Sequence, residues 1–591
     1  MRYFLLPLGL ALAACANAQN GAAPEIVSTA GIAPSWSQAQ AEAVLQRTQR
    51  LHLAPDVSAL SANEQAAVRE LIAAGERLHQ LYLAQRHPQA LAARVYLDAH
   101  PELGAYRDLF SMSIGPVATT LDNTREAFLT VAPETPVRNF YPPAVTHDVM
   151  EAYLTANPQR REELLDPMAI VREATPGQRR ASLATLDRHP VLDTLHPGLR
   201  ARIESADTYL ALPFSVAFAD DVLFVSERLN AAAGHIAGED AAFARYLRLR
   251  ARDLLADDYE GGDAAWVTGD FTGNLNASIG AYETYDDALY GVKRSFALSL
   301  LARDAARSEE LEAGLRDLQL VEDALPYESD REVRSDIPVG VYNIIADFGQ
   351  ARGANTATIL PNDAYLARQY GRTILMRGNI LLNAELFEGN ENAFDAAVTG
   401  GHHGDLTPQG MFDRTLWHEV GHYLGVDLTS DGRDLDSALL DTASLLEEMK
   451  ADLVSLTAAR VLHERGLYDD ARLRGIYASG IRRVLQKNRP RREQPYQTMQ
   501  LMQWNWFMRH GVLRFEDGQL AIDYARYPAA VESLLREVLA IQAAGDRSRA
   551  NAFVDSWTAW DPAVHEVIAQ RMRESETTRF NLVTFEALEP R

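Results

Sequence analysis

The sequence predicts a mainly α-helical protein with a small β core, divided into two lobes. The chain has 591 residues, which is too many for one hydrophobic core, because single cores stop growing at roughly 250–300 residues. Most segments up to about residue 250 are rich in Ala, Leu, Arg and Glu, with apolar residues at helical spacing. Between residues 266 and 361, Gly, Thr, Tyr and Val become more frequent and short alternating stretches appear. We therefore expect a small sheet there, with helices before and after it.

Residues 1–18 are expected to be a signal peptide. An apolar region at residues 4–12 is followed by Leu12 to Cys15, which resembles the lipobox of bacterial lipoproteins, where the cysteine is lipidated. The alternative is ordinary signal cleavage after Ala18. The sequence thus predicts an exported lipoprotein, anchored to a bacterial membrane and facing the periplasm, or otherwise a periplasmic or secreted protein.

The segment after the signal peptide, residues 19–40, is Gly/Ala/Pro/Ser-rich and is expected to be a flexible tether. The folded body is expected to occupy residues 41–591. Its clearest early helix begins at a capping box, Ser61 to Glu64, because Ser at the N-cap and Glu three residues later satisfy each other's backbone N–H groups. Apolar residues follow this box at helical spacing: Val68, Leu71, Ile72, Leu78, Leu81 and Tyr82.

Composition excludes several classes of function. The chain has 57 Lys+Arg and 81 Asp+Glu, a net charge of −24, which repels phosphate backbones and anionic lipids at long range. We therefore expect no nucleic-acid partner, and membrane contact only through the N-terminal lipid anchor. Because Cys15 is the single cysteine, the body has no disulfide framework, Cys-rich metal site or cysteine nucleophile.

The most informative motif is His418 to His422, which reads His-Glu-Val-Gly-His. On a helix, histidines four positions apart project from one face, so both imidazoles can bind one zinc ion while Glu419 stands beside the open coordination position. Apolar residues repeat on the opposite side of the same helix, which predicts a buried back and a presented metal face: Leu416, Val420 and Leu424.

A hydrolytic zinc site needs a third protein ligand. The metzincin extension of the motif would place it at Leu428, which cannot bind a metal, so that pattern is excluded. The run 445–453 is the other source, and it predicts an amphipathic helix that ends near Gly466. Glu448 and Asp452 lie on one face of it, so one carboxylate can bind zinc while the other orients a ligand imidazole.

These motifs together resemble the dipeptidyl peptidase III family of zinc exopeptidases. The family pairs a His-Glu-x-x-(x)-His helix, here 418–422, with a Glu-Glu-x-Arg/Lys-Ala-Glu/Asp helix, here 447–452. Residues 411–417 resemble the family's lead-in to the zinc helix. Upstream, residues 279–291 resemble the family's Glu-Thr/Ser-Tyr segment. The similarity extends over about residues 279–456.

The resemblance implies that His418, His422 and Glu448 bind one Zn²⁺ ion, within a catalytic region at about residues 266–465. It also implies an active-site cleft between two lobes. Further roles follow position by position: Glu419 as general base, Tyr285 as transition-state stabiliser, Glu283 as partner of the substrate's free amino terminus, Asn355 as a residue that binds the substrate backbone, and Glu447 and Asp452 as partners of the ligand histidines.

Two features of the sequence depart from the family pattern. The zinc motif has the five-residue form, one residue shorter than the commonest version. Tyr496 stands about where a catalytic histidine is expected.

Because Glu283 and Tyr285 are two residues apart, we expect them to share one face of a strand, as a joint role requires.

The function expected is that of a zinc-dependent peptidase that hydrolyses short peptides and releases N-terminal dipeptides. One alternative is a zinc aminopeptidase or endopeptidase of other specificity. Another is a catalytically inactive peptide-binding lipoprotein. The presence of Glu419 favours an enzyme, because a protein that only binds peptides does not need a general base to keep its fold.

Overall fold

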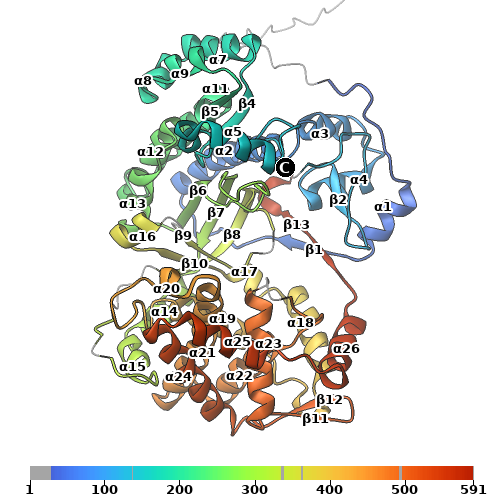
Figure 1. Ribbon diagram of the computed structural model, residues 1–591, viewed down its shortest axis with the longest axis vertical. Coiled ribbons are helices and arrows are strands. Elements are labelled where there is room, and N and C mark those ends of the chain that lie inside the picture. Colours follow the sequence, from blue (N-terminus) through green and yellow to red (C-terminus); the bar gives the residue numbers. More distant parts are fainter. Residues whose placement is uncertain are drawn as a thin grey trace, which may run out of the picture.

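A five-stranded sheet lies near the middle of the molecule in the computed structural model, which describes residues 28–135, 137–329, 331–333, 339–353, 355–360, 364–491 and 495–589 (Figure 1). The strands are ordered β6 (Leu275–Ala281), β7 (Phe296–Arg303), β8 (Val339–Gly349), β10 (Thr373–Arg377) and β9 (Ala357–Leu360). Neighbouring strands are antiparallel except β8 and β10, which are parallel. Within the described residues, β9 is an edge strand.

The predicted small sheet is confirmed, and it extends further along the chain than expected. The prediction ended at residue 361, whereas β10 lies at Thr373–Arg377. All five residues of β10 are buried. A strand buried on both faces has no alternating pattern, so periodicity alone does not distinguish it from a short buried helical segment.

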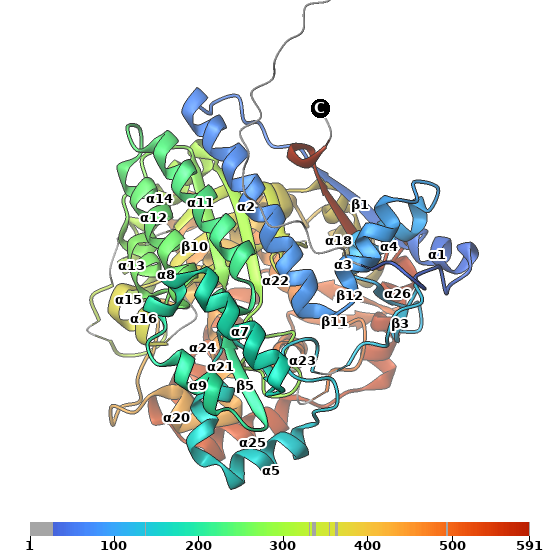
Figure 2. The ribbon, with the colours of Figure 1, turned by 90° about the horizontal axis from the view of Figure 1, so that it is seen from above.

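Helices cover the sheet on the side of the first lobe. The first of them, α2, begins at the predicted capping box and packs on β7 and β8, with α11 beside it (Figure 2). Any side chain at Gly75 of α2 would overlap the ring of Phe348 on β8, so this glycine permits the close approach. The main helices of this lobe are α2 (Ala62–Arg86), α3 (Ala90–Asp98), α4 (Gly104–Ser113), α5 (His147–Ala156), α7 (Pro176–Arg188), α11 (Ala219–Ile236), α12 (Ala241–Ala256) and α13 (Glu260–Thr268).

The second lobe is a separate, mostly helical core below the sheet (Figure 1). Two of its helices, α19 and α21, pack against each other, and α22 lies against both. At the contact between α19 and α22, a side chain at Gly410 would overlap the backbone of Gly475. The main helices of this lobe are α14 (Ala305–Leu315), α18 (Ala384–Ala397), α19 (Pro408–Gly421), α21 (Ala443–Glu464), α22 (Asp470–Val484), α23 (Pro495–Arg509), α24 (Tyr527–Ala544), α25 (Arg547–Trp557) and α26 (Val567–Ser575).

The chain returns from the second lobe to the first at its end. Strand β13 (Phe580–Phe585) pairs in parallel with β1 (Thr48–Leu53) in the first lobe. This pairing ties α26 and the preceding helices back to the N-terminal region, so the end of the chain also connects the two lobes (Figure 1).

The folded body begins earlier than predicted. The expected tether was residues 19–40, but Ile32 and Trp36 are buried in a core with α3 and α4. Trp36 also accepts a 2.7 Å hydrogen bond at its carbonyl oxygen from the Tyr106 hydroxyl. The prediction followed the average composition of the segment and gave no weight to these two apolar residues. The predicted signal peptide and Cys15 lie outside the described residues.

In the part of the chain that the structure describes, no helix has the length and apolarity needed to cross a bilayer.

Candidate metal centre and cavity

Helix α19 presents the His-Glu-x-x-His motif toward a cavity. The Thr407 side chain caps its N-terminus, Pro408 occupies the first turn, and the three residues of the predicted apolar stripe are buried. The helix ends at Gly421, four residues before Gly425, although a glycine just after the last apolar residue is a common helix C-cap. His422 is therefore the C-cap residue, and its ring extends from the last turn of the helix.

The predicted ligand side chains come together. One donor atom each from His418, His422 and Glu448 lie within 4.8 Å of one another. Glu448 is on α21, and its Oε2 atom lies 3.2 Å from Nε2 of His418 and 4.0 Å from Nε2 of His422. The helix-to-helix packing thus converges two imidazole nitrogens and one carboxylate oxygen on one point.

A second set of carboxylates holds the two imidazole rings. Asp452 lies 2.8 Å from Nδ1 of His418, and Glu447 lies 3.0 Å from Nδ1 of His422. Each contact engages Nδ1 and leaves Nε2 facing Glu448. Such carboxylate–histidine pairs fix ring orientation and tautomer at metal sites. Glu447 and Asp452 thus each contact one of the two histidines that they were expected to orient.

Buried cations hold these carboxylates in turn. Lys450 lies 2.8 Å from Glu447, and Arg414 lies 3.0 Å from Asp452. Although burial alone would raise it, Lys450 and His422 lower the pKa of Glu447 to about 2. Burial likewise opposes ionisation of Asp452, but Arg483 and His418 hold its pKa below the usual range. Both carboxylates are therefore ionised at neutral pH.

The donor atoms themselves lie in a field that favours positive charge. Burial alone would lower the pKa of His418, but the carboxylates of Asp452 and Glu448 raise it to about 9. The pKa of Glu448 is lowered despite burial, chiefly by His418 and His422. A cluster of ionised carboxylates around two imidazoles suits a divalent cation, and two nitrogens with one oxygen are a ligand set of catalytic zinc.

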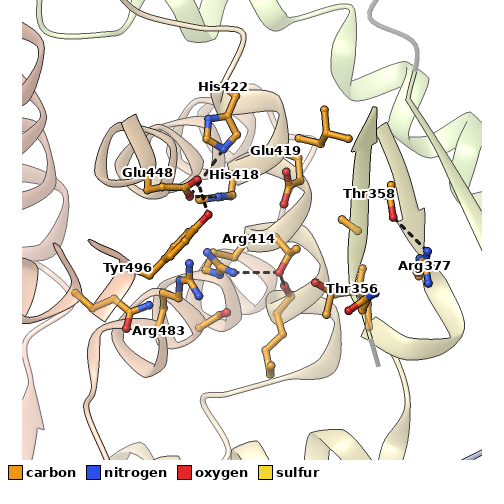
Figure 3. A pocket seen from close by; sticks show the side chains of 18 of the residues that line it. Thr356, Thr358, Arg377, Arg414, His418, Glu419, His422, Glu448, Arg483 and Tyr496 are labelled. Atoms are coloured by element: carbon orange, nitrogen blue, oxygen red, sulfur yellow. Dashed lines mark hydrogen bonds and ion pairs between the residues drawn. The ribbon is translucent and has the colours of Figure 1, made fainter. Parts of the chain in front are cut away.

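The cavity in front of these ligands has a volume of about 1050 Å³ and is lined from both lobes. Figure 3 shows His418, Glu419, His422 and Glu448 on one side and Thr356, Thr358 and Arg377, from the sheet region, on the other. The remaining predicted site residues also line it, namely Glu283, Tyr285 and Asn355. The first lobe therefore contributes the sheet edge, and the second lobe contributes the ligand helices.

Glu283 and Tyr285 reach the cavity from a loop, so the prediction of a shared strand face is wrong. Strand β6 ends at Ala281, because its pairing with β7 ends there. Backbone N–H groups of the following loop converge on the carboxylate of Asp287 and shape the turn. The two side chains nevertheless meet: Glu283 accepts a hydrogen bond from the Tyr285 hydroxyl, and its charge raises the pKa of Tyr285.

The structure adds cavity residues that sequence reasoning did not assign to the site. Arg377 extends from β10 and forms a 2.8 Å ion pair with buried Asp347. Arg482 and Arg483, near the end of α22, and Lys487, which follows it, also line the cavity. Basic residues are dense between Arg482 and Arg491 in the sequence, but only the position of α22 shows which of them line the cavity.

Tyr496, the departure from the family pattern, lies at the metal centre. Its hydroxyl donates a 3.1 Å hydrogen bond to Oε1 of Glu448 (Figure 3). Burial and the Glu448 charge raise the pKa of Tyr496 to about 12, so the phenol stays protonated and can donate. The tyrosine therefore fixes the carboxylate whose other oxygen faces the histidines.

Replacing Tyr496 by Phe should lower metal affinity or activity about 10–100-fold, the range for loss of a partner that orients a ligand. The zinc dissociation constant, measured by competition with a chromophoric chelator, checks this. An exposed tyrosine elsewhere, Tyr365, provides the matched Tyr→Phe control. Equal zinc affinities in the Tyr496 and Tyr365 variants, with equal activities, would contradict a positioning role.

Comparisons with known proteins agree with this architecture. The structure of DPP III from Caldithrix abyssi superposes with a TM-score of 0.76 at 22% identity, covering 92% of this chain and 98% of that one. Dipeptidyl-peptidase III from Corallococcus sp. strain EGB gives a TM-score of 0.68 at 22% identity, covering 92% and 96%. The fold expected from the resemblance is therefore confirmed.

A sequence relative carries a different name. The chain is 26% identical to Nudix hydrolase 3 of Arabidopsis thaliana over 557 residues, which cover 87% of this chain and 70% of that protein. No family model matches the chain.

Proposed function

We propose that this chain, which has the dipeptidyl-peptidase III fold, is a zinc-dependent peptidase that acts on short peptides and releases N-terminal dipeptides. The observation that carries the proposal is the convergence of His418, His422 and Glu448 within 4.8 Å on the wall of a large cavity. Both imidazoles have carboxylate partners at Nδ1. This ligand set with its supporting carboxylates suits one catalytic zinc ion.

The chemistry proposed is hydrolysis of a peptide bond. A bound zinc ion supplies Lewis acidity, which polarises a carbonyl group and makes water more acidic. Glu419 accepts the proton of the attacking water and passes it to the leaving amine. Among the described residues, none donates a hydrogen bond to the Glu419 carboxylate, so this carboxylate is available for the transfer. The Tyr285 hydroxyl exchanges its hydrogen bond to Glu283 for one to the oxyanion that develops, as Glu283 pairs with the substrate's amino terminus.

The cavity also suits an extended peptide. Edge strand β9 lines it, and an extended chain can add to an exposed sheet edge through backbone hydrogen bonds. Asn355 lies two residues before that strand and lines the cavity. Glu283, from the same lobe, offers a carboxylate for the substrate's α-ammonium group. A carboxylate that binds the α-ammonium group at one position fixes which peptide bond reaches the metal. Cleavage then occurs at a set distance from the N-terminus, as in an exopeptidase.

Two readings compete with this proposal. A zinc aminopeptidase or endopeptidase would use the same ligands with another substrate register. An inactive peptide-binding lipoprotein would use the cavity alone. The presence of Glu419 on the cavity wall favours an enzyme over a binding protein, because a carboxylate beside the metal-ligand side chains can act as a general base.

Metal analysis combined with digestion of a mixed peptide library tests the proposal. The purified protein should contain one zinc ion per chain, and mass spectrometry should find dipeptides released from free N-termini. Cleavage at internal bonds would support the endopeptidase instead. A zinc-loaded protein that cleaves no peptide in the library would support the binding protein.

Glu283→Gln should raise KM for short peptides while changing kcat little, because the amide keeps the size of the side chain but loses the charge that pairs with the α-ammonium. Loss of one charge-assisted hydrogen bond corresponds to about 10–100-fold in kcat/KM. N-acetylated peptides should resist the wild-type enzyme for the same reason. Efficient internal cleavage of N-acetylated peptides would refute the exopeptidase part of the proposal and leave the zinc hydrolase part intact.

Tyr285→Phe should instead lower kcat, by about 10²–10³-fold, the usual effect of removing one oxyanion donor. Tyr285 is 81% exposed, so the substitution disturbs no core packing. Steady-state kinetics on one dipeptide-releasing substrate separates kcat from KM. A change confined to KM would assign Tyr285 to binding and not to the transition state.

A further inference from the structure

A second cavity, of about 180 Å³, lies in the first lobe between α2, α3, α4 and the turn that follows β8. Liquid water takes up roughly 30 Å³ per molecule, so a small polyatomic ion can fit. The charged and titratable groups that line it are His79, Arg94, Asp98, Arg107 and Arg352. None of them belongs to the catalytic cavity.

The charges around this cavity do not balance. Three guanidinium groups face one carboxylate, Asp98, which lies 3.8 Å from Arg94 and is mostly exposed. Among the described residues, no carboxylate forms an ion pair with Arg107 or Arg352. Arg107 donates to the carbonyl oxygen of Pro101 at 2.8 Å. The cavity therefore carries an excess of two positive charges in a chain whose net charge is −24.

Arg352 is the least satisfied of the three arginines. Its Nε atom is inaccessible to solvent and has no hydrogen-bond partner within the described part of the chain. Its guanidinium lies 5.5 Å from the centre of the Phe585 ring, a contact that does not satisfy an N–H donor. An unpaired donor on a desolvated cation is costly unless a ligand accepts from that group.

His79 contributes a neutral donor. Its Nδ1 atom accepts a 3.1 Å hydrogen bond from the Gly349 N–H. Burial, with the charges of Arg352 and Arg94, lowers the pKa of His79 to about 3. The ring is therefore neutral at physiological pH, and its proton sits on Nε2 because Nδ1 is an acceptor. It adds no positive charge to the excess of two.

We propose that this cavity binds a phosphate group, either inorganic phosphate or the phosphate of a small monoester, through Arg94, Arg107 and Arg352. A phosphate group carries about −1.5 to −2 charges at pH 7, which matches the excess of two. Guanidinium groups bind phosphate oxygens through paired N–H donors, and burial strengthens such contacts. The proposal does not depend on the peptidase activity proposed above.

Binding should also act on the catalytic cavity. Gln350 and Ala351 line the catalytic cavity, whereas the next residue, Arg352, lines this one. The turn between them is held by backbone bonds from Gln350 to Phe296 and from Arg352 to Gly349. A phosphate group on Arg352 should stiffen this turn, which precedes Asn355 and β9.

Titration of the purified protein with inorganic phosphate and with phenyl phosphate, at constant ionic strength set by sodium chloride, tests the proposal. Calorimetry should show one saturable site for at least one of the two, with a rise in Tm. Hydrogen exchange of a peptide covering residues 345–353 should slow in its presence. Binding of both probes identifies a site open to monoesters, and binding of inorganic phosphate alone identifies a site for the free ion. No saturation by either probe would overturn the proposal.

Variants distinguish this site from general charge effects. Arg352→Gln and Arg107→Gln should each weaken phosphate binding about 10–100-fold, as expected for loss of charged hydrogen bonds. Asp98→Asn should tighten phosphate binding, because it removes the one carboxylate that lines the cavity. The Asp98 side chain is mostly exposed, so this variant should fold normally. Arg245→Gln, an exposed arginine of α12, is the control and should change nothing. Equal phosphate affinity in wild type, Arg107→Gln and Asp98→Asn would overturn the proposal even if Arg352→Gln failed to fold.

Discussion

Replacing Glu419 by Gln is expected to leave the zinc content unchanged and to lower kcat by about 10²–10⁴-fold, the contribution of a general acid–base group. The donor atoms that converge belong to His418, His422 and Glu448, and Glu419 is not among them. Its carboxylate lines the cavity beside them. The amide of glutamine keeps the shape but cannot accept a proton, so the substitution removes proton transfer and preserves the metal site.

Metal content by mass spectrometry and single-turnover kinetics on a short peptide check this result together. Glu385→Gln, on the exposed first turn of α18, is a matched control for the chemical change. Wild-type turnover in the Glu419 variant would exclude it as the base. Loss of zinc in the same variant would show that Glu419 supports the metal centre and would leave its catalytic role without support.

The ligand helices could be predicted because their chemistry is local. Four residues separate His418 from His422, and helical geometry alone places such residues on one face. The same reasoning placed Glu448 and Asp452 on one face of α21, and their contacts with His418 follow from it. The sequence also predicted that the second helix ends near Gly466, and α21 ends at Glu464. Helix α19 ends at Gly421, before the glycine at position 425.

The first-lobe half of the cavity could not be predicted in this way. Glu283 and Tyr285 sit in a loop whose shape is set by Asp287, and an alternating pattern gives no information on such a loop. The position of β10 beside β8 is a long-range pairing, so no local signal reveals it. Arg377 reaches the cavity only because of that pairing.

The role of Tyr496 also required the structure. By sequence it marks a position where a histidine was expected, which left its function open. The packing of α23 against α21 brings its hydroxyl to Glu448 at 3.1 Å. A substitution that seemed to remove a catalytic group thus places a hydrogen-bond donor on a predicted metal ligand.

Removing the carboxylate of Glu448 should have the largest effect of all. Glu448→Ala is expected to lose stoichiometric zinc and all measurable peptidase activity. Catalytic zinc sites use three protein ligands, and Glu448 supplies the one oxygen among the three converging donors. Without it, His418 and His422 remain as two neutral ligands, and a charge that favours a divalent cation is gone.

Glu447→Gln is the matched control for this loss, because Glu447 is the neighbouring carboxylate on the same helix and contacts Nδ1 of His422 rather than the converging donors. Its zinc affinity should fall only about 10–100-fold, as for other partners that orient a ligand. Zinc content after dialysis separates the two variants. Melting provides a second readout, since a metal that binds the folded state raises Tm by mass action. Added zinc should therefore stabilise wild type and, at higher concentration, the Glu447 variant, but not the Glu448 variant. Full zinc occupancy in Glu448→Ala would remove Glu448 from the ligand set. Glu419 would then become the candidate third ligand, because it is the other described carboxylate of the second lobe that lines the cavity.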